Sequence, residues 1–125
     1  LSDLAPSLPA TIGAPLGGGM GRLREVSGAV SGMSMIAGLY YKNDVPSDMA
    51  KRKQVYATVQ ELAEQSKALN GSIICRELLG LDHKSDAPTP EARTEAYYKR
   101  RPCADYVASA ARLIGEKLKQ EISKE

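Results

Sequence analysis

The sequence contains no tryptophan, no phenylalanine, one histidine and only two cysteines among its 125 residues. A hydrophobic core must therefore be built from aliphatic side chains, methionine and some of the six tyrosines. Two cysteines are too few for a disulfide-stapled scaffold. The single histidine, His83, has no partner at the spacing of metal ligands, so we interpret it as a solvated loop residue. The length suits one core, and we expect residues 1–125 to form a single helical domain.

Long hydrophobic runs and a strong charge of one sign are also missing. The formal net charge is +2, which argues against a disordered chain and gives no support for nucleic-acid binding. The one candidate for a membrane segment is the uncharged run 26–41. It is shorter than the roughly 20 apolar residues that a spanning helix needs. We expect no membrane span and a cytoplasmic location, and we leave open a removed signal peptide upstream of Leu1.

Apolar residues recur at spacings of three and four, and no segment alternates with period two long enough to form a strand. The fold is therefore predicted to be all-α, a compact helical bundle of about five helices. Besides a turn or two within residues 4–16, the predicted helices cover residues 21–41, the segment from the N-cap Ser47 to residue 70, residues 73–80, the segment from the cap Thr89 to residue 98, and residue 102 onward. Gly71 is the predicted stop of the second of these helices. Their predicted core stripes are Leu23, Val26, Val30, Met33 and Ala37, then Val55, Tyr56, Val59, Leu62, Ala63 and Leu69, and finally Tyr106, Val107, Ala110, Leu113, Ile114 and Leu118.

The helix predicted over residues 21–41 is apolar nearly all round, which is typical of a buried helix. Gly28 and Gly32 lie on one of its faces, where they would allow close approach by another helix or a ligand. A glycine cluster precedes this helix and could cradle an anion. No strand precedes it and the phosphate-loop pattern is absent, so we favour a tight turn. The weak candidates for cofactor binding are Gly17, Gly18, Gly19 and Gly21.

Cys103 follows Pro102, a predicted first helical residue, and the basic run 99–101. Helix N-termini and nearby cations both lower the pKa of a thiol, and the thiolate is the reactive form. Cys75 has a similar setting, because Ser72 is a predicted N-cap and Arg76 is adjacent. The pattern predicts two reactive thiols. The alternative is that both cysteines are small, buried, unreactive core residues.

Three segments, GGGMGRLREVSGAVSG, GSIICRELLG and RPCADYVASAARLI, resemble a family of small proteins regarded as redox-active and named for a C…GCAxxG…C…C pattern. The resemblance covers nearly the whole chain. It implies thiol-centred or metal-centred redox chemistry, relatives with four cysteines that could hold a metal or an Fe–S cluster, and oxidoreductase or transporter partners. It matches Cys75 and Cys103 with the last two cysteines. It places Ser27 at the box cysteine, with SGAVSG set against CGAxxG, and the first cysteine in a helix upstream of Leu1.

Three hypotheses follow, and they leave open whether the protein is an enzyme. In the first, Cys75 and Cys103 cycle between dithiol and disulfide, which requires their α-carbons to lie within about 7 Å. Two thiols cannot complete a four-cysteine metal site within one copy. In the second, the chain is a non-catalytic helical accessory module that has lost its redox or metal centre. In the third, the glycine cluster binds an anion or small ligand. A homodimer could cover the apolar face that an absent N-terminal helix would leave.

Overall fold

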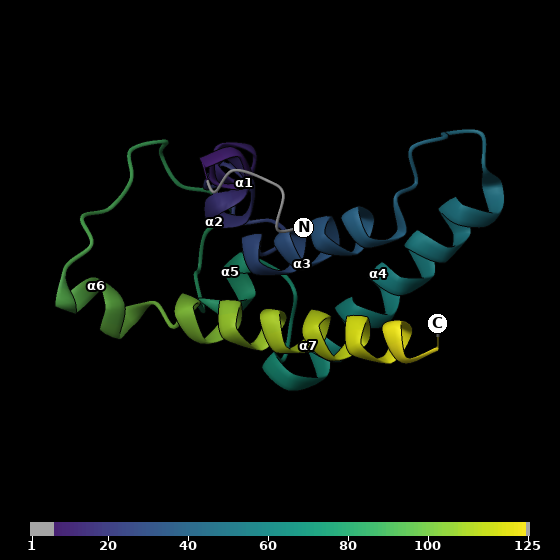
Figure 1. The fold of residues 1–125 in the computed structure, drawn as a ribbon. Helices are drawn as coiled ribbons and strands as arrows, with labels where there is room; N and C mark the ends of the chain where they lie inside the picture. Colours follow the sequence, from purple (N-terminus) through teal and green to yellow (C-terminus); the bar gives the residue numbers. More distant parts are fainter. Residues whose placement is uncertain (1–6, 125) are drawn as a thin grey trace.

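The computed structural model describes residues 7–124, and its regular structure is helical (Figure 1). Helices account for 69% of those residues, and no strand occurs among them. This confirms the all-α class. Part of the first predicted turn, residues 4–6, lies outside the described residues. The elements are α1 (Ser7–Gly13), the 3-10 turn η1 (Ala14–Leu16), α2 (Gly17–Met20), α3 (Gly28–Tyr41), α4 (Met49–Asn70), α5 (Cys75–Leu78), α6 (Glu95–Arg100) and α7 (Cys103–Ser123).

Several predicted helix starts were wrong, because a different residue supplies the cap. The α3 helix begins at Gly28, not residue 21, and Ser27 Oγ accepts the Ala29 N–H at 3.3 Å. For α4 the cap is Asp48, one residue after the predicted Ser47. A side-chain oxygen at the N-cap replaces a missing backbone partner, so whichever residue adopts that geometry sets the start.

The later boundaries show the same effect. The helix predicted from residue 90 begins only at Glu95, with Thr94 as its cap. Pro102 is the N-cap of α7, so Cys103 occupies the first helical position. Cys75 is likewise the first residue of α5. The predicted stop at Gly71 is present, because this glycine caps α4 with a left-handed φ of 94°.

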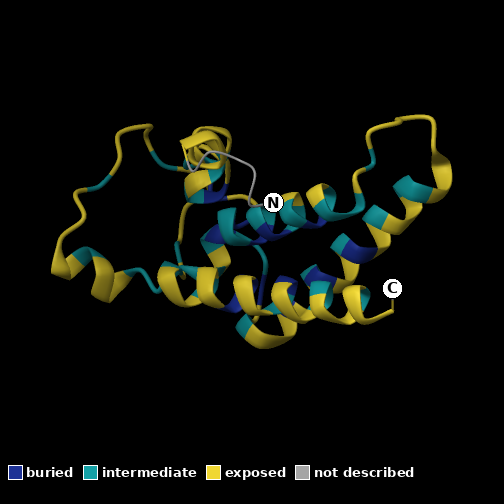
Figure 2. Ribbon diagram, viewed as in Figure 1, coloured by how far each residue is buried: buried dark blue, intermediate teal, exposed yellow. Residues whose placement is uncertain are grey.

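The core lies where α3, α4 and α7 pack against one another (Figure 1). Figure 2 shows the buried residues on the facing sides of these helices. The buried cluster consists of Val30, Met33, Ala37, Leu62, Ala110 and Ile114. All six belong to the predicted stripes, which place the core correctly at its centre.

The outer parts of the predicted stripes are wrong. Leu23, Val26, Tyr56, Leu69 and Val107 are all exposed. The buried face of α4 consists of Thr58, Leu62 and Ser66 instead. The expectation that α3 is buried all round also fails, since Met35 and Leu39 are exposed. Thr58 and Ser66 lie four residues before and after Leu62, so a single narrow face of α4 is buried.

Among residues 7–124, no helix combines the length and the apolar character needed to cross a bilayer. This finding agrees with the short uncharged run of the sequence, which becomes the 14-residue helix α3.

Candidate functional site

A cavity of about 1190 Å³ lies beside α3 and is lined by parts of α1, α2, α5 and α7. Cys75, Cys103 and Ser27 all line it, so the structure brings the three predicted site residues to one cavity. Gly17, Gly18 and Gly19 contribute to its wall as well. Its remaining wall is mainly aliphatic. Cavities of this kind, apolar with a few convergent polar groups, are typical of ligand sites.

The glycine cluster forms a left-handed turn. Positive φ values occur without a break from Gly18 to Arg22 and again at Arg24. Left-handed conformations cost non-glycine residues roughly 1–2 kcal/mol each, which explains why three of these positions are glycine. The carbonyls of Gly18 and Gly19 accept the N–H groups of Arg24 and Glu25 at 3.0 and 2.9 Å. The turn therefore explains the glycines at positions 18, 19 and 21.

Gly19 brings the turn into direct contact with Cys75. A Cβ atom at Gly19 would lie 2.6 Å from the Cβ of Cys75. The backbone N–H of Cys75 donates to the Glu25 carbonyl, and an isolated bridge pairs Val26 with Ile74. The turn thus fixes the first residue of α5, and the Cys75 side chain is buried beneath it.

Arg24 is the site residue that sequence reasoning missed. It is 5% exposed, and its Nη1 donates to the Cys75 sulfur at 3.6 Å. Its Nε donates to Asp86 Oδ2 at 2.7 Å. Burial by itself would lower the pKa of Arg24, but its contacts with Cys75 and Asp86 raise it. Arg24 and Cys75 are 51 residues apart, so no local pattern indicates the contact.

Cys103 differs from its predicted state. It is half-buried, and burial raises the pKa of its thiol, with the nearby Cys75 adding to the rise. Arg101, Arg24 and Arg93 oppose this effect without overcoming it. The lowered pKa expected from the basic run is therefore wrong for Cys103. Arg101 also pairs with Glu91 at 3.0 Å, which places a negative charge beside its positive one.

His83 has more partners than a solvated loop residue needs. Its Nδ1 lies 3.1 Å from Asp82 Oδ1 and its Nε2 lies 2.9 Å from Asp86 Oδ1. The hydrogen bond with Asp82 is the main cause of the raised pKa of His83, and Asp86 contributes further. The side chain remains 44% exposed. The chain of contacts therefore runs from Cys75 through Arg24 and Asp86 to His83 at the surface.

We expect His83 to stabilise the fold only when it is protonated. Because its pKa is raised in the folded state, its contribution is complete below the unfolded pKa and is lost as the pH rises through the folded value. The difference in Tm between wild type and His83→Gln should therefore be larger near about pH 5.5 than near about pH 8.5. Thermal melts at both pH values measure it. An equal difference would contradict the ion pairs, and no other histidine complicates the comparison.

Among residues 7–124, no three His, Cys, Asp or Glu side chains are placed to hold a metal ion together. A zinc or Fe–S site with thiolate ligands requires about four such ligands. Cys75 and Cys103 supply two. The described residues of one copy therefore do not fit a tetrathiolate centre.

A family model described as "Putative redox-active protein (C_GCAxxG_C_C)" matches residues 4–117, which is most of the chain. The chain belongs to this family. The resemblance found in the sequence is thereby confirmed. A search of the curated proteins and a search of the solved structures found no match.

The letters of the C_GCAxxG_C_C pattern also allow a second register for the box, one residue along from the one expected from the sequence. With Ala29 and Gly32 on the alanine and last glycine of GCAxxG, the cysteine position falls on Gly28, and Ser27 falls on the first glycine. The structure accounts for both residues. Ser27 caps α3, and a Cβ atom at Gly28 would lie 2.9 Å from the Leu16 carbonyl oxygen. In contrast, Gly32 has no atom within 4 Å of such a Cβ, so its expected close contact is absent.

Proposed function

We propose that this chain is a thiol–disulfide redox protein in which Cys75 attacks the substrate and Cys103 completes the exchange. The observation that carries the proposal is the placement of both free thiols on one cavity. Cys75 also affects the ionisation of Cys103, which supports their proximity. The redox-active character of the family agrees with this chemistry.

The different surroundings of the two thiols assign their roles. Cys75 receives a hydrogen bond from a buried arginine, so a positive charge faces its sulfur. Cys103 has no such donor among the described contacts, and burial keeps its pKa above the ordinary value. In thiol–disulfide exchange the thiolate attacks, so Cys75 is the nucleophile.

The proposed reaction takes a substrate disulfide. The Cys75 thiolate attacks one sulfur, forming a mixed disulfide and releasing the first substrate thiolate, which accepts the Cys103 proton. The Cys103 thiolate then attacks Cys75 and releases the second substrate thiolate. Two electrons pass from the protein dithiol to the substrate, and the protein retains a Cys75–Cys103 disulfide. An oxidoreductase partner with a dithiol would return the protein to its reduced state.

Intact mass after incubation with oxidised glutathione tests this sequence of steps. Wild-type protein should lose two hydrogens and form the internal disulfide, whereas Cys103→Ser should stop at the mixed disulfide. Cys75→Ser should react at least about tenfold more slowly, because the remaining thiol is mainly protonated. Two stable glutathione adducts on wild-type protein, or no reaction, would contradict the proposal.

The second candidate is a non-catalytic accessory module. It is favoured by the glycine at position 28, which removes the thiol of the family's box. Such a module needs a binding surface, and the exposed Met35 and Leu39 on α3 offer one. The expected homodimer would cover them. Two thiols that resist alkylation in the folded protein would favour this candidate, and a monomeric mass by light scattering would contradict the dimer.

A further inference from the structure

One guanidinium contacts both the candidate nucleophile and an acidic loop. Arg24 donates to the Cys75 sulfur through Nη1 and to Asp86 through Nε. The guanidinium is a fixed planar fork, so these two contacts hold its orientation. Asp86 also faces His83 through its other oxygen. The buried positive charge is thus divided between a sulfur and a carboxylate.

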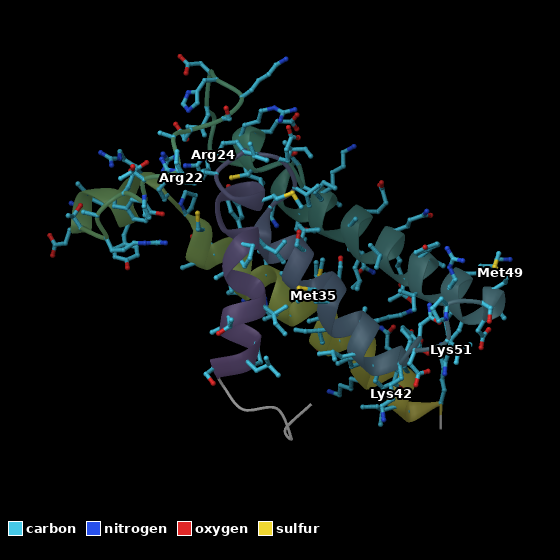
Figure 3. The ribbon with its side chains drawn as sticks, turned by 90° about the horizontal axis from the view of Figure 1, so that it is seen from above. Arg22, Arg24, Met35, Lys42, Met49 and Lys51 are labelled. Carbon is cyan, nitrogen blue, oxygen red and sulfur yellow. The ribbon has the colours of Figure 1, made fainter. Side chains whose placement is uncertain are left out.

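The backbone around Arg24 maintains this arrangement. Arg24 has a φ of 59°, a conformation that costs a non-glycine residue free energy and persists only where its surroundings enforce it. Its N–H binds the Gly18 carbonyl, and its own carbonyl accepts the N–H of Arg76. The Asp86 loop is anchored as well, because Arg22 accepts the Asp86 N–H and donates to the Ala87 carbonyl. Figure 3 shows Arg22 and Arg24 next to each other at this end of the molecule, with Lys42 at the other end.

We propose that Arg24 activates the Cys75 sulfur for attack and that Asp86 weakens this activation by competing for the same guanidinium. The inference rests on the proposed function, since it makes residues 82–86 a regulator of the nucleophile. Arg24 contacts the reacting sulfur and is a catalytic residue in this scheme. Asp86 acts through Arg24 and is a positioning residue.

Neutralising Arg24 and neutralising Asp86 should change the reactivity of Cys75 in opposite directions. Removing the positive charge of Arg24 leaves the buried sulfur without its cationic partner and should lower its reactivity. Removing the negative charge of Asp86 leaves the sulfur as the partner of the Arg24 positive charge and should raise the reactivity of Cys75. Asparagine keeps an oxygen that can accept from Arg24 Nε, so Asp86→Asn changes the charge while preserving the hydrogen bond. A merely structural role for Asp86 would not increase the reactivity of Cys75.

The test is the pH dependence of iodoacetamide alkylation in the full chain, with Cys75 and Cys103 quantified separately by mass spectrometry. Arg24→Gln should slow the alkylation of Cys75 at neutral pH by roughly tenfold or more. Asp86→Asn should accelerate it by about threefold to tenfold, with the pH midpoint moved downward. Glu25→Gln is the matched control, because that carboxylate pairs with Arg76 and not with Arg24. It should leave the midpoint unchanged.

An unchanged Cys75 midpoint in folded Arg24→Gln, or an unchanged or higher midpoint in Asp86→Asn, would overturn the inference. Where Arg24→Gln fails to fold, Asp86→Asn alone decides. The outcome is separable from that of the proposed function. Shifted midpoints without an internal disulfide would reject the dithiol cycle only, whereas a working cycle with unshifted midpoints would reject the role of Arg24 and Asp86 only.

Discussion

Replacing Gly19 by alanine is expected to destabilise the protein by about 3 kcal/mol or more, the sum of a left-handed backbone and an overpacked contact. The new Cβ would lie 2.6 Å from the Cβ of Cys75 and 2.7 and 2.8 Å from the backbone nitrogen and oxygen of Glu25. Backbone atoms cannot yield as a flexible side chain does. Relief would require separation of the turn from α5, which breaks the hydrogen bond from Cys75 to Glu25. Urea unfolding measures the loss.

Two further glycine substitutions separate the causes. Gly21 also has a positive φ, but the nearest atom to an added Cβ is 3.9 Å away, so Gly21→Ala should cost only about 1 kcal/mol. Gly115 lies within α7 with open space around it, so Gly115→Ala should stabilise the helix by about 1 kcal/mol. If Gly19→Ala proved no worse than Gly21→Ala, the close packing against Cys75 would be refuted.

Leu62→Ala is expected to have the second large effect, a loss of about 2–5 kcal/mol in the free energy of unfolding. Leu62 has no exposed surface and belongs to the core cluster between α3, α4 and α7. Truncation removes its apolar contacts and leaves a cavity that the surrounding helices fill only in part. Chemical denaturation, followed by circular dichroism of the helices, gives the value.

Leu69→Ala is the matched control on the same helix. Leu69 is 66% exposed, although the sequence pattern groups it with Leu62. Surface substitutions of this kind usually change stability by no more than about 0.5 kcal/mol. Similar losses for the two variants would show that α4 buries the wider apolar stripe and not the face that contains Thr58 and Ser66.

The helical class and the centre of the core could be predicted because both depend on periodicity, which is local. The starts of α4 and α6 could not, because nearby residues offer caps of nearly equal quality. The start of α3 could not either, because a left-handed turn extends through residues 18–24. Ser47 and Asp48 are both good N-caps, as are Thr89 and Thr94. Tertiary contacts decide between them. For example, Arg22 accepts the Asp86 N–H and donates to the Ala87 carbonyl, and these bonds hold residues just before the predicted cap Thr89 against the glycine turn.

The thiol site was predictable only where it depends on local sequence. Each cysteine does begin a helix, and each lies near an arginine in sequence. The arginine that contacts Cys75 is nevertheless Arg24 and not its neighbour Arg76, whose guanidinium pairs with Glu25. Only the left-handed turn brings Arg24 over α5. A run of positive φ values at non-glycine residues has no reliable sequence pattern, because those residues disfavour it on their own.

The contact between Leu16 and Gly28 limits how this chain could acquire a third thiol. A cysteine at position 28 would place its Cβ 2.9 Å from the Leu16 carbonyl oxygen, which belongs to the backbone of η1. That substitution becomes acceptable only after η1 has shifted. The order of changes therefore matters: a chain that first loosens residues 14–17 can accept the cysteine, whereas one that substitutes Gly28 first passes through a strained intermediate. While position 28 is glycine, the close approach of Leu16 therefore opposes its replacement by any larger residue.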